Sequence, residues 1–160
     1  MWMFNMLGPM VNPAQPAYQL VGVYNLEMAR IYNYLLQQSN KPFTIIHSLD
    51  GYDEVSLTND TKVITNKGEQ VLTPEQVGRC RVDPQELHGG QTVEESARLF
   101  LRILKGEGSR AQSAVVLANA AMALHCTGQY PDYDHAFADA VKSLDSGAAF
   151  ATLEKLIALQ

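Results

Sequence analysis

Residues 18–47 read YQLVGVYNLEMARIYNYLLQQSNKPFTIIH and predict a β-strand, an α-helix and a second β-strand. The run 18–24 is rich in Val and Tyr, which favour strands, and Asn25 is a suitable N-cap for the helix that follows. Leu26 to Gln38 carries an apolar stripe at helical spacing: Met28, Ile31, Tyr32, Leu35 and Leu36. Phe43 to His47 is the second strand. Two strands joined by one helix form a βαβ unit, so we expect these strands to be parallel.

The chain changes character after residue 60. Thr61–Thr65 and Glu69–Leu72 flank the turn residues Asn66-Lys67-Gly68, which predicts a hairpin exposed on one face. Thr73-Pro74 then begins a short helical turn, because a Thr cap and a Pro at the first position favour a helix start. From Thr92 onward every segment is predicted to be helical.

Three N-capping residues and two glycines divide the helical part. Thr92 with Glu95, and Ser109 with Gln112, are predicted capping boxes. Lys105-Gly106 closes the first of these helices, and Asp132 caps another that ends at Gly147.

Two of the predicted helices carry specific expectations about burial. The helix from Ala114 to Cys126 is apolar on nearly every face, so we expect it deep in the core, with His125 as a satisfied core residue. The last helix, Phe150 to Leu159, is expected to bury the stripe Leu153, Leu156 and Ile157. The predicted class is therefore α/β, with a parallel or mixed sheet, flanking helices and a helical C-terminal half.

Composition sets limits on the function. The 160 residues are 46% hydrophobic and 18% charged, with a formal net charge of -5, so the chain lacks the basic surface typical of nucleic-acid binding. No apolar run is long enough to span a bilayer, and the start does not resemble a signal peptide. Cys80 and Cys126 lie far apart without metal-ligand spacing, which indicates a reduced, cytoplasmic protein.

An acidic run follows the second predicted strand. Asp50, Asp53 and Glu54 fall within five positions directly after His47. One interpretation is a solvated turn helped by Gly51; the other is a Mg2+ site, since Mg2+ prefers carboxylate oxygens and substrate phosphates. The residues alone favour the turn. For His47 they favour a structural hydrogen bond over a catalytic role.

Several segments, in one order along the chain, resemble the anthranilate phosphoribosyltransferase family. Phe4 to Pro13 is similar to the family's Phe-Asn-Leu-Leu-Gly-Pro-Leu-Leu-Asn-Pro segment, and Tyr18 to Tyr24 to its next strand. Asp50 to Ser56 matches the family's Asp-Gly-x-Asp-Glu-x-Ser signature. Two later segments also fit: Asn119-Ala120-Ala121 and Asp145-Ser146-Gly147-Ala148-Ala149.

The resemblance implies a reaction of tryptophan biosynthesis, in which phosphoribosyl is transferred from phosphoribosyl pyrophosphate (PRPP) to the amino group of anthranilate. It implies Asp53 and Glu54 as the Mg2+-binding pair, and Gly8 and Pro9 as part of the anthranilate channel. His47 and Asp50 receive no role, and no catalytic residue is assigned. The implied fold is that of the C-terminal domain of the nucleoside phosphorylase and phosphoribosyltransferase class. Residues 18–160 would form the α/β domain, and 1–17 an apolar segment on the hinge or helical-domain side.

The resemblance covers only the C-terminal half of such a transferase. The Gly-rich loop that holds the diphosphate has no counterpart here, so we expect the chain alone to be inactive, since positioning both substrates is a large part of catalysis. Two alternatives remain: a non-catalytic scaffold or partner-binding relic, and a relative of pyrimidine nucleoside phosphorylase. Four of the six methionines lie in the first ten residues. We expect this apolar start to pack on a second copy or another chain, with a homodimer as the predicted assembly.

Overall fold

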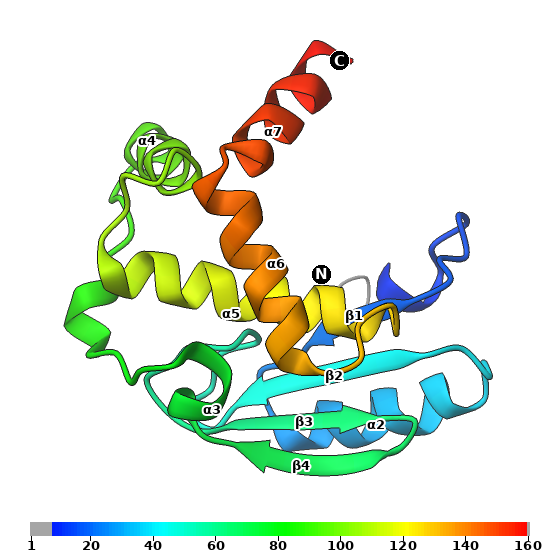
Figure 1. The fold of residues 1–160 in the computed structure, drawn as a ribbon. Coiled ribbons are helices and arrows are strands. Elements are labelled where there is room, and N and C mark those ends of the chain that lie inside the picture. The colour runs from blue at the N-terminus through cyan, green and yellow to red at the C-terminus, as the bar shows by residue number, and fades with distance from the viewer. Residues whose placement is uncertain (1–7, 160) are drawn as a thin grey trace.

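The computed structural model describes residues 8–159, which form a mixed β-sheet with helices on both faces (Figure 1). The spatial order of the strands is β1 (Gln19–Gly22), β2 (Phe43–Ser48), β3 (Thr61–Thr65) and β4 (Gly68–Leu72). β1 and β2 are parallel, whereas β3 pairs antiparallel with both β2 and β4. The predicted α/β class, βαβ unit and hairpin are confirmed.

Helix α2 (Leu26–Gln37) connects the two parallel strands. Its N-cap is Asn25, whose side-chain oxygen accepts a hydrogen bond from the backbone nitrogen of Met28 at 2.8 Å. The side chains that α2 buries are those of Met28, Ala29, Tyr32 and Leu36. Ile31 and Leu35 remain 40% and 43% exposed, so the predicted stripe was too wide. Only the narrower stripe of α2 is covered by the sheet.

Alternate residues of the strands supply two hydrophobic layers. Ile45 and Ile64 face α2, whereas Ile46 and Val63 face the helices on the other side of the sheet. This alternation is what the period of two along a strand dictates. On the second face, the cluster is completed by four residues of helix α5 (Arg110–Cys126): Ala111, Ala114, Ala118 and Met122.

The remaining elements are short turns and three further long helices. The turns are η1 (Gly8–Met10), α3 (Pro74–Gly78) and η2 (Pro84–Leu87). The helices are α4 (Val93–Leu104), α6 (Tyr133–Asp145) and α7 (Ala148–Ala158). The helical C-terminal half is thus confirmed.

The two predicted capping boxes have different outcomes. Ser109 and Gln112 exchange both bonds, as predicted. Thr92 accepts from the backbone nitrogen of Glu95 at 3.1 Å, but the Glu95 carboxylate accepts from the backbone nitrogen of Gln91 at 2.8 Å rather than from that of Thr92. A capping box also requires the Glu95 side chain to accept from the backbone nitrogen of Thr92. This bond was predicted wrongly, since Glu95 accepts from the residue before Thr92.

Burial along α5 is less complete than its composition predicts. The helix buries one face of small side chains, whereas Val116 and Leu117 are only partly buried. His125 is exposed, with its ring edge-on to Tyr133 at 6.1 Å between centroids, so its assignment to the core was wrong. The small face of α5 allows close approach to the sheet, and the opposite face lies partly open.

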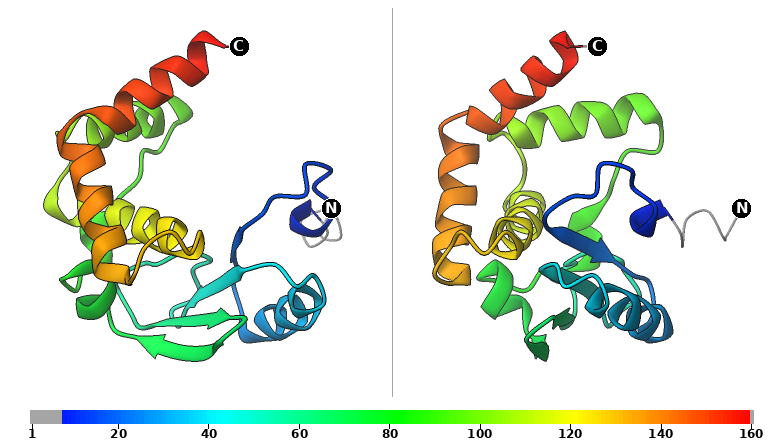
Figure 2. Two further views of the ribbon diagram at one scale, coloured as in Figure 1. Left: turned by 45° about the vertical axis from the view of Figure 1, so that its right-hand side comes forward. Right: turned by 90° about the vertical axis from the view of Figure 1, so that its right-hand side faces the viewer.

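Helix α7 also departs from prediction. Leu153 is partly buried, but Leu156 and Ile157 are 56% and 58% exposed, so the predicted buried stripe is wrong for two of its three members. Figure 2 shows α7 beside α4 and away from the sheet. Their facing surfaces form a groove lined by Leu101, Phe150, Leu153, Glu154, Ile157 and Ala158. Within residues 8–159, α7 packs mainly against α4 and α6.

No helix within residues 8–159 has both the length and the apolar character needed to cross a membrane. Both cysteines are free; Cys126 is buried and its thiol donates to the carbonyl oxygen of Gln19 at 3.4 Å. The first seven residues of the apolar start lie outside the described part of the chain, so its packing on a second copy or another chain stays a prediction.

Candidate functional site

The acidic loop, residues 49–60, joins β2 to β3 at the carboxyl ends of the two parallel strands. In α/β sheets this edge is the usual place for ligands. The loop contains all three carboxylates of the acidic run: Asp50, Asp53 and Glu54. The sequence therefore placed them correctly at the strand ends.

Two apolar side chains anchor the loop in the core. Val55 and Leu57 are fully buried within the cluster beneath α5. Leu57 has a φ of 60°, a left-handed conformation that costs a non-glycine residue about 1–3 kcal/mol. Its carbonyl oxygen accepts from the backbone nitrogen of Val82 at 3.0 Å. The surrounding packing imposes this conformation, so the loop is a firmly held part of the fold.

Glycine at the end of β1 lets the loop approach the sheet. A β-carbon at Gly22 would lie 1.6 Å from the carbonyl oxygen of Asp53. Only glycine leaves this space open. The backbone of Asp53 therefore rests directly on the end of β1.

Ser48, the last residue of β2, fixes the loop backbone from below. Its hydroxyl donates to the carbonyl oxygen of Glu54 at 2.6 Å and accepts from the backbone nitrogen of Ser56 at 3.1 Å. Its own backbone nitrogen donates to the carbonyl oxygen of Tyr52 at 3.0 Å. Ser48 is completely buried, so these bonds are shielded from water.

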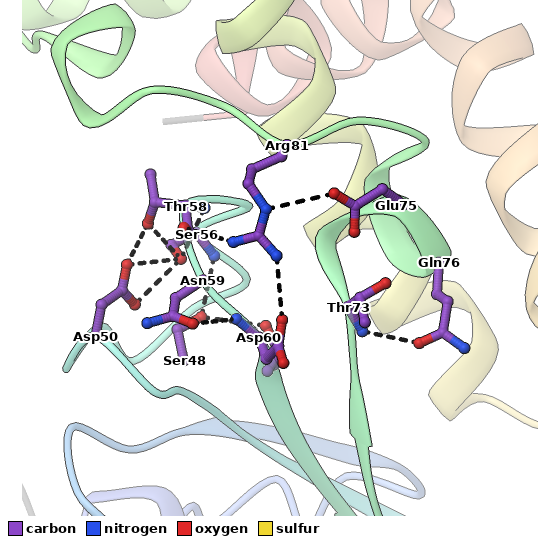
Figure 3. A network of polar contacts seen from close by, with 11 residues as sticks. Ser48, Asp50, Ser56, Thr58, Asn59, Asp60, Thr73, Glu75, Gln76 and Arg81 are labelled. Atoms are coloured by element: carbon purple, nitrogen blue, oxygen red, sulfur yellow. Dashed lines mark hydrogen bonds and ion pairs between the residues drawn. The ribbon is translucent and has the colours of Figure 1, made fainter.

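Asp50 is used inside the loop. Figure 3 shows its carboxylate directed at two hydroxyls. Ser56 donates to both carboxylate oxygens, at 3.2 and 3.3 Å, and the hydroxyl of Thr58 donates to one of them. Asp50 therefore folds the loop back on itself and leaves Asp53 and Glu54 outside this network.

Arg81 secures the far end of the loop (Figure 3). Its guanidinium donates to the carbonyl oxygen of Thr58 at 3.1 Å and forms ion pairs with Asp60 and Glu75, each at 3.4 Å. These groups are about half exposed, so each pair contributes little alone. The Arg81 guanidinium therefore pairs with the carboxylates of Asp60 and Glu75, and not with those of Asp53 and Glu54.

The carboxylates of Asp53 and Glu54 are directed outward. Both residues are exposed, and within residues 8–159 neither carboxylate accepts a hydrogen bond or forms an ion pair. Partial burial, and secondarily the neighbouring Asp53 charge, raise the pKa of Glu54 above its ordinary value. Two adjacent anions without a protein cation are a donor set that a divalent ion would suit.

This donor set matches Mg2+ more closely than a metal that needs an all-protein cage. Within residues 8–159, no group of three or more His, Cys, Asp or Glu side chains gathers to hold a metal. Mg2+ typically uses one or two carboxylates together with water and substrate phosphates. The pair is therefore compatible with Mg2+ that is shared with a phosphate ligand.

His47 serves the structure, as predicted. Its Nδ1 lies 2.8 Å from the carbonyl oxygen of Val23, and the side chain is buried. Because a carbonyl can only accept, Nδ1 carries the proton. This bond joins β2 to the residue that follows β1.

Gly8 and Pro9 lie at the opposite end of β1 from the acidic loop. The carbonyl oxygen of Pro9 accepts from the side-chain amide of Gln19, the first residue of β1, at 2.5 Å. Asp53 contacts Gly22, the last residue of that strand. The structure thus brings Asp53 and Glu54 together but leaves Gly8 and Pro9 separated from them by the length of β1.

Four residues that shape the site received no predicted role in it: Gly22, Ser48, Arg81 and Asn119. A lone Gly in a strand signals close backbone approach, so Gly22 was detectable in principle. A lone Asn in an apolar helix is a comparable signal for Asn119, whose carboxamide binds the backbone of Val55. Ser48 and Arg81 act on segments that only the fold brings near.

Comparisons with known proteins place the chain among its relatives. Residues 2–150 match the model of the glycosyl transferase family, a/b domain. Anthranilate phosphoribosyltransferase of Christiangramia forsetii is 52% identical over 153 residues, 96% of this chain and 46% of the relative. That of Bacteroides thetaiotaomicron is 48% identical over 156 residues, 98% of this chain and 47% of the relative. The chain thus spans about half the length of these curated relatives.

Solved structures give the same fold. Anthranilate phosphoribosyltransferase from Thermus thermophilus superposes with a TM-score of 0.85 at 34% identity, covering 97% of this chain and 46% of that one. The Saccharomyces cerevisiae enzyme, solved in complex with PRPP and Mg, has a TM-score of 0.83 at 24% identity, covering 94% and 44%. The match over residues 2–150 shows that the chain belongs to the glycosyl transferase family defined by this α/β domain, and the relatives that it resembles are anthranilate phosphoribosyltransferases.

Proposed function

We propose that this chain supplies the metal-binding α/β half of an anthranilate phosphoribosyltransferase of tryptophan biosynthesis. In that reaction the amino nitrogen of anthranilate forms a bond to C1 of the ribose of PRPP. The bond from C1 to the diphosphate oxygen breaks, and pyrophosphate leaves. Asp53 and Glu54 are the proposed Mg2+ ligands.

The observation that carries the proposal is that the carboxylates of Asp53 and Glu54 have no protein partner within residues 8–159. Every other acidic side chain of the loop has a protein partner: Asp50 binds hydroxyls and Asp60 binds Arg81. Asp53 and Glu54 have none within residues 8–159, although the loop that carries them is anchored by buried Val55 and Leu57 at the carboxyl edge of the sheet. Fixed backbone with unpaired carboxylates is the arrangement expected of metal ligands.

The chemistry of the transfer gives such a pair a role. Negative charge develops on the departing pyrophosphate, and bound Mg2+ would stabilise that charge and orient the leaving group. Asp53 and Glu54 would fix the position of the ion, because they themselves are fixed by Gly22 and Ser48. Their mutual repulsion, which helps to raise the pKa of Glu54, would be relieved by the cation.

Metal titration tests the pair directly. Mn2+ added to the 160-residue chain should broaden the amide resonances of residues 51–56, and excess Mg2+ should reverse the broadening. Asp53→Asn with Glu54→Gln should weaken this binding by about tenfold or more, since neutral amides replace two ionic ligands. The matched control is Glu94→Gln with Glu95→Gln, an adjacent exposed pair at the start of α4. Equal effects of both double variants would contradict the proposal.

We propose further that the chain needs the rest of the enzyme for activity. Its relatives are about twice as long, and the positioning of both substrates is a large part of the catalysis. The 160-residue chain should form no phosphoribosylanthranilate alone. Mixed with the N-terminal half of the Christiangramia forsetii relative, it should form product in a manner that depends on Asp53 and Glu54. Steady turnover by the isolated chain would overturn this part of the proposal.

Gly8 and Pro9 are proposed as part of the anthranilate channel, within a segment, residues 1–17, on the hinge or helical-domain side of the α/β domain 18–160. Supporting this, residues 9–13, Gln15 and Pro16, together with Gln19, Leu36 and Lys41, border a concave surface at the amino end of β1. In the complemented enzyme, Pro9→Ala should raise the KM for anthranilate and leave the KM for PRPP unchanged. A selective effect on PRPP would contradict the assignment.

We also propose that the protein is a cytoplasmic homodimer. Free Cys80 and Cys126 suit a reducing compartment. Exposed Leu156 and Ile157 supply apolar surface for association. Sedimentation over a wide concentration range should show a dimer, and a monomer at the highest concentration would contradict this.

A further inference from the structure

Asn119 extends from the middle of α5 to the acidic loop and binds both backbone groups of one residue. Its Oδ1 accepts from the backbone nitrogen of Val55 at 2.9 Å, and its Nδ2 donates to the carbonyl oxygen of Val55 at 2.9 Å. A pair of residues in an antiparallel ladder exchanges the same two bonds. The side chain of Asn119 thus replaces a neighbouring strand at this point of the loop.

The orientation of this carboxamide is fixed by a third bond. Nδ2 also donates to the carbonyl oxygen of Val115, one turn earlier on α5, at 2.9 Å. A flipped carboxamide would place its oxygen against two carbonyl oxygens, those of Val55 and Val115. The amide therefore has one satisfactory orientation, and that orientation is tied to the helix.

These bonds act on the peptide that follows Glu54. The carbonyl group of this peptide accepts from the hydroxyl of Ser48 at 2.6 Å, and its N–H group donates to Asn119. The plane of the Glu54–Val55 peptide is thus held at both ends, by β2 and by α5. One peptide earlier, the carbonyl of Asp53 rests on Gly22. Together these contacts determine where the Cα atoms of Asp53 and Glu54 point their side chains.

We propose that Asn119 is a positioning residue for the Asp53–Glu54 metal pair. It touches neither carboxylate and no substrate, and it acts by fixing the Glu54–Val55 peptide through α5. This inference rests on the proposed metal function of the pair. It adds a residue 64 positions away in the sequence, on a different element, to the machinery that holds the ion.

A purely structural role is the competing explanation, because Asn119 also ties the loop to the core. The two roles differ in what they change. An anchor that only stabilises the fold affects the temperature of unfolding but leaves the metal affinity of folded molecules unaltered. A positioning residue affects the metal affinity of molecules that remain folded.

The experiment uses the full chain with Mn2+ as probe. Asn119→Leu removes all three bonds at similar volume, and Asn119→Ser is the milder variant, since it leaves room for water at the backbone of Val55. Both should weaken Mn2+ binding by about tenfold or more, measured as broadening of residues 51–56. Amide hydrogen exchange of residues 53–56 should accelerate in the same variants. The remainder of the sheet should keep its protection.

Tyr133→Phe is the matched control. The hydroxyl of Tyr133 also bridges backbone groups, with the carbonyl oxygens of Val77 at 2.8 Å and Ala118 at 3.0 Å as its acceptors, and neither hydrogen bond involves the acidic loop. This variant should lower the unfolding temperature without changing Mn2+ affinity. If Tyr133→Phe weakens Mn2+ binding as much as Asn119→Ser, or if a folded Asn119 variant binds Mn2+ as tightly as the original chain, the proposal is overturned.

The unmodified chain supplies an independent check should both variants fail to fold. The amide hydrogen of Val55 should exchange as slowly as those of β2, and exchange at the rate of a surface amide would overturn the inference. Absence of Mn2+ broadening in the unmodified chain would overturn the proposed metal site instead. In that case, slow exchange of the Val55 amide in the unmodified chain would still show that this peptide is held.

Discussion

Gly22 lies directly against the backbone of Asp53, so closely that a β-carbon at position 22 would fall 1.6 Å from the carbonyl oxygen of Asp53. The last residue of β1 is thus in direct contact with the backbone of the first proposed metal ligand. The pairing of β1 with β2 fixes the position of Gly22. Because Asp53 rests on Gly22, the sheet also fixes the position of the Asp53 backbone. The acidic loop is therefore an extension of the sheet's carboxyl edge.

Gly22→Ala should displace the loop. The added methyl group cannot share space with the Asp53 carbonyl, so either β1 or the loop must move, and we expect the free energy of unfolding to fall by about 1–3 kcal/mol. Mn2+ broadening of residues 51–56 should weaken together with it. Chemical denaturation and the Mn2+ titration measure the two effects. Gly89→Ala is the control, since nothing lies within 4 Å of a β-carbon there, and an equal loss in both variants would contradict the steric explanation.

Asp50→Ala should loosen the loop from within. Removal of the carboxylate leaves the hydroxyls of Ser56 and Thr58 without their anionic acceptor, and the network is partly exposed. A loss of about 1–2 kcal/mol in the free energy of unfolding is expected. Asp50→Asn should recover part of it, because the amide oxygen still accepts one hydroxyl. A variant that matches the original chain by urea denaturation would show that the network contributes nothing.

Most of the fold follows from local sequence signals. The run 18–47 specifies strand, helix and strand through Val-rich composition, the Asn25 cap and the helical stripe, and these signals act over a few residues. The prediction erred where burial depends on distant elements. Leu156 and Ile157 have the spacing of a buried stripe, but within residues 8–159 more than half of each side chain stays exposed. Spacing predicts an apolar face and cannot identify the surface that covers it.

The sequence predicted the proposed metal-binding side chains of the candidate site, but not the residues that hold their backbone in place. Asp53 and Glu54 are adjacent in the sequence, and the family signature singles them out. Asn119 and Gly22 act on the loop across 64 and about thirty residues of chain, so their role required the folded backbone. His125 shows the reverse case, since an apolar sequence context predicted burial and the helix turns that side chain outward.

Leu156→Gln with Ile157→Gln should leave the stability of the monomer nearly unchanged. Both side chains are more than half exposed, so their replacement removes little buried area, and a change within about 0.5 kcal/mol is expected. Thermal unfolding at low concentration measures this. Leu144→Gln on α6 is the contrasting variant, because Leu144 is buried and should tolerate the amide poorly. A large loss in the α7 double variant at low concentration would show that α7 is covered in the folded chain.

The N-terminus of α6 should carry a pH-dependent cap. Nδ1 of His135 lies 2.7 Å from Oδ1 of Asp132, the N-cap residue, which also accepts from the backbone nitrogen of His135 at 2.9 Å. The hydrogen bond to Asp132, and then its charge, raise the pKa of His135. The same hydrogen bonds from His135 lower the pKa of Asp132.

These shifts fix the direction of the pH effect. A raised histidine pKa gives stability that is fully present below the unfolded value of 6.5 and is lost as pH rises through the folded value. The lowered carboxyl pKa gives stability that is present above 3.8 and is lost as pH falls through the folded value. The cap should therefore be most stable in the weakly acidic range between these limits. Because the pair is exposed, added salt should reduce the effect.

Asp132→Asn separates charge from capping, because Asn is an equally good N-cap but carries no charge. In this variant α6 should remain capped, while the titration of the His135 ring carbons in a 1H–13C NMR spectrum should move down toward the ordinary pKa. The fall in unfolding temperature between pH 6 and pH 8 should diminish with it. A His135 titration that is identical in the two proteins would show that the Asp132 carboxylate does not hold the proton on the ring, and the pH dependence of α6 would then need another origin.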